Sequence, residues 1–288
     1  MTAMAVLTAT MTDDSQARAD DHRGTVSDTS PSSRVARSVW LTLGGLIAIA
    51  ALGWGTFNVV GLLAHGEYTT TWEFSADDVR AVDIRSDNGS MTVIAAPVDV
   101  VEVTADVSDG LAATDVSAEI VSGVLELRGG CPVAALVWCD VGFTVSVPAD
   151  RPITIDATDG SVVVRDTTAR VDVDNDNGSI EVDGVTGEVR ASNDNGSFIG
   201  RNLGSDILAA STSNGTIELV FSDPPTTVSG RTSNGRIEVT VPDEEVLYRV
   251  EMRTQNGSAD SSVRTDPASD RLIDLETDNG SITVRSSG

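Results

Sequence analysis

Apolar and polar residues alternate on both sides of eight Asn-Gly or Asp-Gly pairs. Apolar side chains recur seven and five positions before each glycine and two and four positions after it, with Asp, Glu, Thr and Arg between them. From the second pair onward the glycines follow one another at intervals of 18 to 23 residues, whereas 71 residues separate the first two. The pairs are Asn88-Gly89, Asp159-Gly160, Asn177-Gly178, Asn195-Gly196, Asn214-Gly215, Asn234-Gly235, Asn256-Gly257 and Asn279-Gly280.

A period of two is typical of strands with one buried face, and Asn-Gly suits a tight reversal because both residues tolerate positive φ. A unit of about 20 residues cannot bury its own apolar face, so tandem copies predict a repeat architecture. Two all-β arrangements fit: a meander of hairpins, or a β-solenoid (β-helix-like) in which each unit is one coil. The constant register of the apolar columns favours the solenoid, with the asparagines from Asn177 to Asn279 forming a ladder at one corner.

Residues 97–148 interrupt this spacing and lack the Asn-Gly corner. We expect irregular coils there, together with an insertion that carries Cys131 and Cys139, the only cysteines of the chain. We expect this part to be exported, and an oxidising compartment favours a disulfide between them. A two-cysteine metal site would need histidines nearby, and the sequence has none in this region.

An uncharged apolar segment of 26 residues, 39–64, precedes the repeats. Because about 20 apolar residues cross a bilayer as a helix, we predict one transmembrane helix at 38–65 that contacts membrane lipid. The alternatives are a buried core helix, which the uninterrupted apolarity disfavours, and a signal peptide, whose apolar region is shorter.

The sequence on either side of this segment predicts its orientation. Residues 1–37 are rich in Thr, Ser, Ala and Asp without apolar periodicity, which predicts a disordered tail. Arg34 and Arg37 lie just before the apolar segment, and acidic residues follow it. The positive-inside rule therefore predicts a cytoplasmic N-terminus and an extracytoplasmic solenoid at 66–288.

The charge balance limits the classes of partner. The chain has 44 acidic residues and 19 basic ones, all arginine, so its formal net charge is −25. Such a surface repels phosphates, and we therefore expect no nucleic acid partner. An extracytoplasmic ligand or protein is more favourable if it is cationic or neutral.

A search for catalytic and metal-binding patterns predicts none. The only histidines, His22 and His65, lie outside the repeats, which excludes a Ser-His-Asp triad there, and no lysine base exists. Asp172, Asp174 and Asp176 alternate before one corner, but the EF-hand spacing fails, so we interpret them as an outward strand face, leaving weak Ca²⁺ binding at acidic turns open. We predict no catalytic residue, no metal site and no cofactor.

Units such as SDNGSMTV, ATDGSVVV, NDNGSIEV, TSNGTIEL and TDNGSITV, together with a membrane segment, resemble the bacterial putative-adhesin family DUF4097. The segment VSVPADRPITIDATDGSVVV is similar to the family's V-x-V-P…NG-x-I-x-V signature. The resemblance covers about residues 72–288 and implies a β-helix-like ectodomain at the cell surface. The chain departs from the pattern at Arg236, where Ser or Thr is usual, and at Ala259 and Ser261, where large apolar residues belong.

Three functions are compatible with these features. The first is a membrane-anchored cell-surface scaffold, an adhesin or interaction module without catalytic activity. The second is an envelope-sensing or regulatory protein whose cytoplasmic tail partners a signalling system. The third is a polysaccharide-active β-helix enzyme, which would need a cleft with two carboxylates about 5–9 Å apart.

Overall fold

A computed structural model describes residues 41, 43–52, 54, 66–109, 113–131, 139–242 and 245–287. The chain divides into two units, Met1–Gly55 and Thr56–Gly288. In the first unit, residues 41, 43–52 and 54 are helical. Within the described part of the chain, no helix combines the length and the apolar character that crossing a bilayer requires. The predicted tail and the rest of the predicted membrane segment lie outside the described residues.

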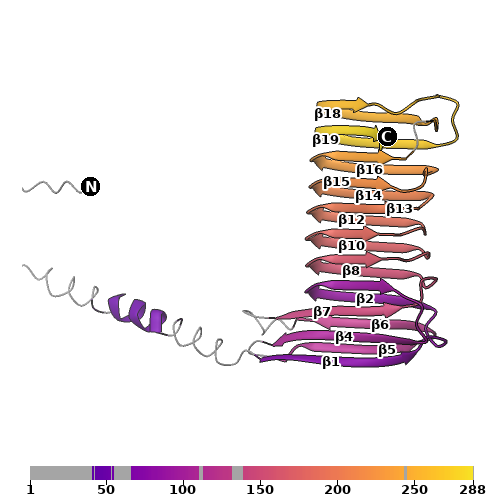
Figure 1. The fold of residues 1–288 in the computed structure, drawn as a ribbon. Helices are drawn as coiled ribbons and strands as arrows, with labels where there is room; N and C mark the ends of the chain where they lie inside the picture. The colour runs from indigo at the N-terminus through magenta and orange to yellow at the C-terminus, as the bar shows by residue number, and fades with distance from the viewer. Residues whose placement is uncertain are drawn as a thin grey trace, which may run out of the picture. The chain divides into compact units, whose positions relative to one another are not determined.

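The second unit is all-β, which confirms the all-β part of the predicted fold class. Its 19 strands join into one sheet that curls into a nearly closed, barrel-like shape (Figure 1). The strands are β1 (Gly66–Ser75), β2 (Ala81–Asn88), β3 (Met91–Ala95), β4 (Val100–Asp109), β5 (Asp115–Val121), β6 (Val124–Gly130), β7 (Asp140–Val147), β8 (Ile153–Asp159), β9 (Val162–Arg165), β10 (Val171–Asn177), β11 (Ile180–Asp183), β12 (Val189–Asn195), β13 (Phe198–Leu203), β14 (Ile207–Asn214), β15 (Ile217–Phe221), β16 (Thr227–Asn234), β17 (Ile237–Val241), β18 (Arg249–Ser261) and β19 (Leu272–Ser286).

Two ladders of parallel strands make up most of the sheet. β8, β10, β12, β14 and β16 form one ladder, and β9, β11, β13, β15 and β17 form the other. Residues at the same distance from their corner glycines are partners: Val171 pairs with Ile153 on one side and Val189 on the other. Each repeat therefore adds one strand to each ladder, and like residues stack on like.

The apolar columns of the sequence line the interior. Ile155, Leu208 and Ile217 are at most 1% exposed, while the residues between them face outward. Asn175 and Asn193 are buried near the corner, and their side-chain amides donate to the carbonyls of Gly160 and Gly178 at 3.3 and 2.8 Å. These hydrogen bonds give the amide groups of the two buried asparagines a partner, because a buried polar group without one would be costly.

The stretch 97–148 differs from the irregular coils that we expected, because it holds the regular strands β4 to β7. β6 and β7 pair in parallel with β2 and β3, and β5, β4 and β1 add to them in antiparallel fashion. β2 and β3 also pair with β8 and β9 on their other side. The chain thus leaves the stack after β3, builds strands beyond it and returns at β8, which explains the 71-residue interval.

The other end of the stack also departs from chain order. β19 pairs with β16 and β17 on one side and with β18 on the other, so β18 is the outermost strand (Figure 1). Ala259 and Ser261, the small residues of the apolar columns, are exposed there. Large apolar side chains are unnecessary at these positions because no further coil covers them.

Candidate binding face

The corner residues singled out in the sequence stack directly on one another. The spatial order of the asparagines is Asn177, Asn195, Asn214, Asn234, Asn279 and Asn256, and from Asn195 onward each side-chain amide donates to the side-chain oxygen of the preceding asparagine at 2.9–3.0 Å. Asp159 is the register partner of both Asn88 and Asn177, but its carboxylate has no N–H to donate, so the asparagine ladder ends at Asn177.

At each corner the glycine backbone lies in close contact with the backbone stacked on it. A Cβ added to Gly160, Gly178, Gly196, Gly215, Gly235, Gly257 or Gly280 would lie 1.6–1.8 Å from the carbonyl oxygen of the stacked glycine. Added to Gly89, it would lie 2.3 Å from the Val141 carbonyl oxygen. The Asn-Gly corners therefore hold the coils together, and at six of the eight corners the glycine N–H donates to the carbonyl of the residue that precedes the stacked glycine.

The two cysteines are joined in a disulfide, with their Cα atoms 5.8 Å apart. Cys131 N–H donates to Asp87 Oδ2 at 2.9 Å, and the Asn88 amide donates to the Cys139 carbonyl at 2.8 Å. The ends of this loop are therefore fixed to the first corner. Residues 132–138, within the loop, lie outside the described residues.

A different set of side chains, which we call the outer face, points away from the core. It comprises the outward residues six and four positions before the corner glycine on β8, β10, β12, β14, β16, β19 and β18. The strand register aligns them in two columns. They are Thr154, Asp156, Asp172, Asp174, Arg190, Ser192, Ala209, Ser211, Ser229, Arg231, Asp274, Glu276, Glu251 and Arg253.

The outer face is hollowed where its side chains are short. A depression of about 490 Å³ extends from β8 to β16, and its lining includes Ala209, Ser211 and Ser229. Acidic side chains of β8 and β10 line one end of the depression, and Arg190 of β12 and Arg231 of β16 line the rest of it. A second depression, of about 320 Å³, adjoins it toward β19 and shares three lining residues with it, among them Ser211. Together they form a shallow, continuous surface across several coils.

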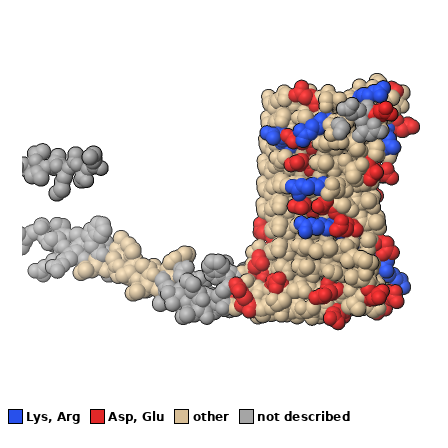
Figure 2. Space-filling model, viewed as in Figure 1, with Lys and Arg blue, Asp and Glu red and all other residues tan. Residues whose placement is uncertain are grey.

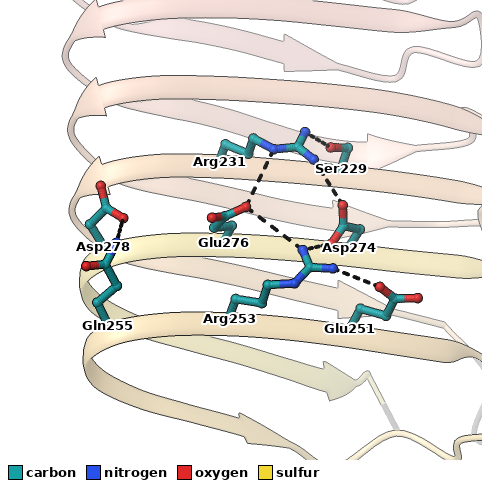
Figure 3. A network of polar contacts seen from close by, with 8 residues as sticks. All are labelled: Ser229, Arg231, Glu251, Arg253, Gln255, Asp274, Glu276 and Asp278. Atoms are coloured by element: carbon teal, nitrogen blue, oxygen red, sulfur yellow. Dashed lines mark hydrogen bonds and ion pairs between the residues drawn. The ribbon is translucent and has the colours of Figure 1, made fainter.

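Ion pairs hold the arginines of this face in place. Arg231 contacts Asp274 at 3.0 Å and donates to Ser229 Oγ at 2.7 Å, while Arg253 contacts both Asp274 and Glu251 at 2.9 Å (Figure 3). Because each guanidinium is shared among oxygen partners, the arginines do not form a free anion site. Thr154 and Ser192, the exposed hydroxyl residues of the depression, keep their hydrogen-bonding capacity for solvent or a ligand.

The acidic end of the depression is similarly organised. Asp172 accepts hydrogen bonds from Arg170 Nε at 2.6 Å and from its terminal nitrogen at 2.9 Å. These hydrogen bonds, and the charge of Asp172, raise the pKa of Arg170 above its ordinary value. Asp156 and Asp174 face each other in the register without an arginine between them, so this end stays net acidic.

The described residues were also compared with the requirements of a metal site. Among them, no three His, Cys, Asp or Glu side chains are grouped so that they could hold a metal ion. His22 and His65 lie outside the described residues. Sequence reasoning treated the outward columns only as a polar face. The signal for the depression was the run of small residues, Ala209, Ser211 and Ser229, that appears when the units are aligned on their glycines.

Comparison with known proteins gives structural likenesses only. No family model matches the chain, and neither does any curated protein. A putative adhesin from Parabacteroides distasonis matches with 12% identity and a TM-score of 0.44, covering 75% of this chain and 97% of its own. A putative cell adhesion protein from Clostridium sporogenes has 9% identity and a TM-score of 0.34, covering 77% and 100%. A putative lipid binding protein from P. distasonis has 8% identity and a TM-score of 0.35, covering 76% and 97%. The resemblance to DUF4097 therefore stays a prediction, and likenesses at this level do not establish a shared function.

Proposed function

We propose that residues 66–288 are a β-solenoid ectodomain, displayed outside the cell by a membrane anchor at 39–64, and that it acts as a non-catalytic interaction module. The parallel pairing of successive repeats in both ladders supports the solenoid interpretation. The length and apolarity of the anchor segment support the location.

The observation that carries the binding role is the depression across β8 to β16. It is shallow and spans several coils, which suits an extended ligand better than a small molecule. Its floor offers hydroxyl groups, its acidic end favours positive charge, and its arginines are already paired. The ligand class that fits is a neutral or cationic polar polymer, or a protein surface of that character.

A pair of matched variants tests this proposal. Ala209→Tyr places a bulky outward side chain in the depression, and Val220→Tyr places the same side chain outward on β15 of the same coil. The full chain, purified in detergent, is applied to an array of neutral, cationic and anionic envelope polysaccharides and proteins at several salt concentrations. We expect binding to a neutral or cationic component that Ala209→Tyr abolishes and Val220→Tyr preserves.

Other outcomes of this assay would contradict the proposal. Binding that both variants retain would place the interaction elsewhere, and salt-resistant binding to a polyanion would refute the ligand class. Turnover of any polysaccharide on the array would instead favour an enzyme.

The proposed location has its own test. Protease added to intact cells should degrade residues 66–288 and spare the N-terminal tail. Protection of the ectodomain would reverse the proposed topology.

A further inference from the structure

Three described strands have a partner on one side only. β1 pairs with β4, β5 pairs with β6, and β18 pairs with β19. A free strand edge presents a row of unpaired backbone N–H and C=O groups, and proteins protect such edges with proline, bulges or charge. β18 is 13 residues long, contains no proline and follows β19 from Arg249 to Ser261.

The charges of the three edges distinguish β18 from the others. β1 carries only Glu67 and Glu73, and β5 likewise carries only acidic residues among its charged positions. A second copy meeting either edge would place like charges together, which is unfavourable. β18 instead presents Arg249, Glu251 and Arg253 in alternation, so it can be complementary to itself.

The surroundings of β18 also favour approach by a second copy. Residues 245–271 carry four arginines and five acidic residues, whereas residues 66–131, at the other end, carry three arginines and 13 acidic residues. Figure 2 shows mainly acidic side chains at the β1 end and both signs of charge at the β18 end. Repulsion between two copies of this chain is therefore weakest at β18.

The hydrogen-bond pattern of β18 limits the possible registers. Arg249 N–H donates to the Arg271 carbonyl at 2.8 Å, toward the β19 side. Because successive residues of a strand alternate, Val250, Met252 and Thr254 direct their N–H and C=O groups to the free edge. In an antiparallel pair these three residues must face their counterparts in the second copy.

Two registers place opposite charges together, but an axis at Val250, which places Arg249 opposite Glu251, pairs only residues 249–251 of β18, whereas an axis at Met252 pairs residues 249–255. With the two-fold axis at Met252, Val250 faces Thr254 of the second copy and Glu251 faces Arg253, twice in the pair. An axis at residue 251 would place Glu251 opposite itself, and an axis at residue 253 would do the same to Arg253. Directly opposed like charges destabilise a sheet, so the axis at Met252 is favoured.

We propose that β18 is a contact through which two copies of this chain associate end to end, antiparallel about a two-fold axis at Met252. The contact continues each sheet into its partner and covers Val250 and Met252, which are half-buried and packed on the core. The same patch serves both copies, as in other two-fold interfaces. The contact uses Glu251 and Arg253 at the β18 end of the outer face, and neither residue lines the depression across β8 to β16.

Single cysteines test the register on the full chain, whose native cysteines are already paired. Residues opposed at the axis lie about 5.5 Å apart at Cα, within disulfide range. We expect Met252→Cys to give a reducible dimer under mild oxidation, whereas Thr254→Cys alone does not. The double variant Val250→Cys/Thr254→Cys should form the dimer again. Equal cross-linking of Met252→Cys and Thr254→Cys would overturn the register.

Charge reversal tests the interface without new thiols. Glu251 and Arg253 are exposed, so changing them should leave the fold intact, as far-UV circular dichroism can verify. Arg253→Glu puts two like-charge pairs in the interface and should raise the dimer dissociation constant by about tenfold or more, measured by sedimentation. Glu251→Arg/Arg253→Glu restores complementarity and should recover the dimer. A wild-type chain that stays monomeric at all concentrations, or a dimer indifferent to Arg253→Glu, would overturn the proposal.

Discussion

Gly196 offers a sharp test of how closely the coils stack. Its φ is +145°, a backbone conformation that residues with a side chain rarely adopt. A Cβ at this position would lie 1.7 Å from the carbonyl oxygen of Gly178 and 3.0 Å from the Asn193 amide nitrogen, which itself donates to that carbonyl. Gly196→Ala can be accommodated only if two adjacent coils move apart at the corner.

The cost of this change can be estimated from its parts. An unfavourable backbone conformation costs about 1–3 kcal/mol. Separating the coils also weakens the hydrogen bonds from Gly178 N–H to the Asn195 carbonyl and from the Asn193 amide to the Gly178 carbonyl, at about 1 kcal/mol each. We expect Gly196→Ala to lower the free energy of unfolding by about 3 kcal/mol or more.

Gly130→Ala is the matched control, because its added Cβ would meet no atom closer than 3.8 Å and its φ is not positive. It should change the free energy of unfolding by about 0.5 kcal/mol or less. Both variants are compared with the wild type by urea unfolding, followed by far-UV circular dichroism. A Gly196→Ala protein as stable as the control would refute the close corner stacking.

Three further changes test the core, the ladder and the disulfide by the same unfolding assay. Ile217→Asp buries an unpaired charge and should cost several kcal/mol, whereas the outward Glu218→Ala should cost about 0.5 kcal/mol or less; equal effects would mean that the strand faces are reversed. Asn214→Ala removes two ladder hydrogen bonds of 3.0 Å at an exposed corner and should cost about 1 kcal/mol; no loss would assign the ladder no net stability. Reducing Cys131–Cys139 reopens a short loop and should cost about 2.5 kcal/mol; unchanged stability would show that the loop contributes nothing.

The sequence predicts the strands and their buried faces well, because both follow from local rules. Alternation places Leu208 and Ile217 inside, and the positive φ required at the turns identifies the corners. The ladder from Asn177 to Asn279 follows from the constant register. Predicting these features requires only the sequence of one unit and the assumption that a similar unit stacks beside it.

The order of the units at the two ends could not be predicted in this way. All repeats share the same columns, so the alternation does not distinguish a neighbour that is next in the chain from one that is two units away. The order β16, β19, β18 depends on which unit can lie at the end of the stack with one side uncovered. The small residues Ala259 and Ser261 of β18 were the sequence feature that indicated this unit. Strands β4 to β7 lack the Asn-Gly corner, and their antiparallel pairing was hidden for that reason.

The depression could not be predicted from the alternation of apolar and polar residues either. Its volume depends on three short outward side chains, Ala209, Ser211 and Ser229, becoming neighbours across β14 and β16. A single unit shows only one or two small residues at these outward positions. Only the stacked register turns them into a surface.

Both the outer face and the free edge of β18 depend on β19 lying between β16 and β18, and a pair of double-cysteine variants measures this order directly. Ser229 of β16 is the register partner of Asp274 of β19, and Glu251 of β18 lies on the far side of Asp274. Under mild oxidation, peptide mapping by mass spectrometry should find the disulfide in Ser229→Cys/Asp274→Cys and not within one chain of Ser229→Cys/Glu251→Cys. A disulfide in the second variant and none in the first would show that the coils stack in chain order, contrary to the structure described above.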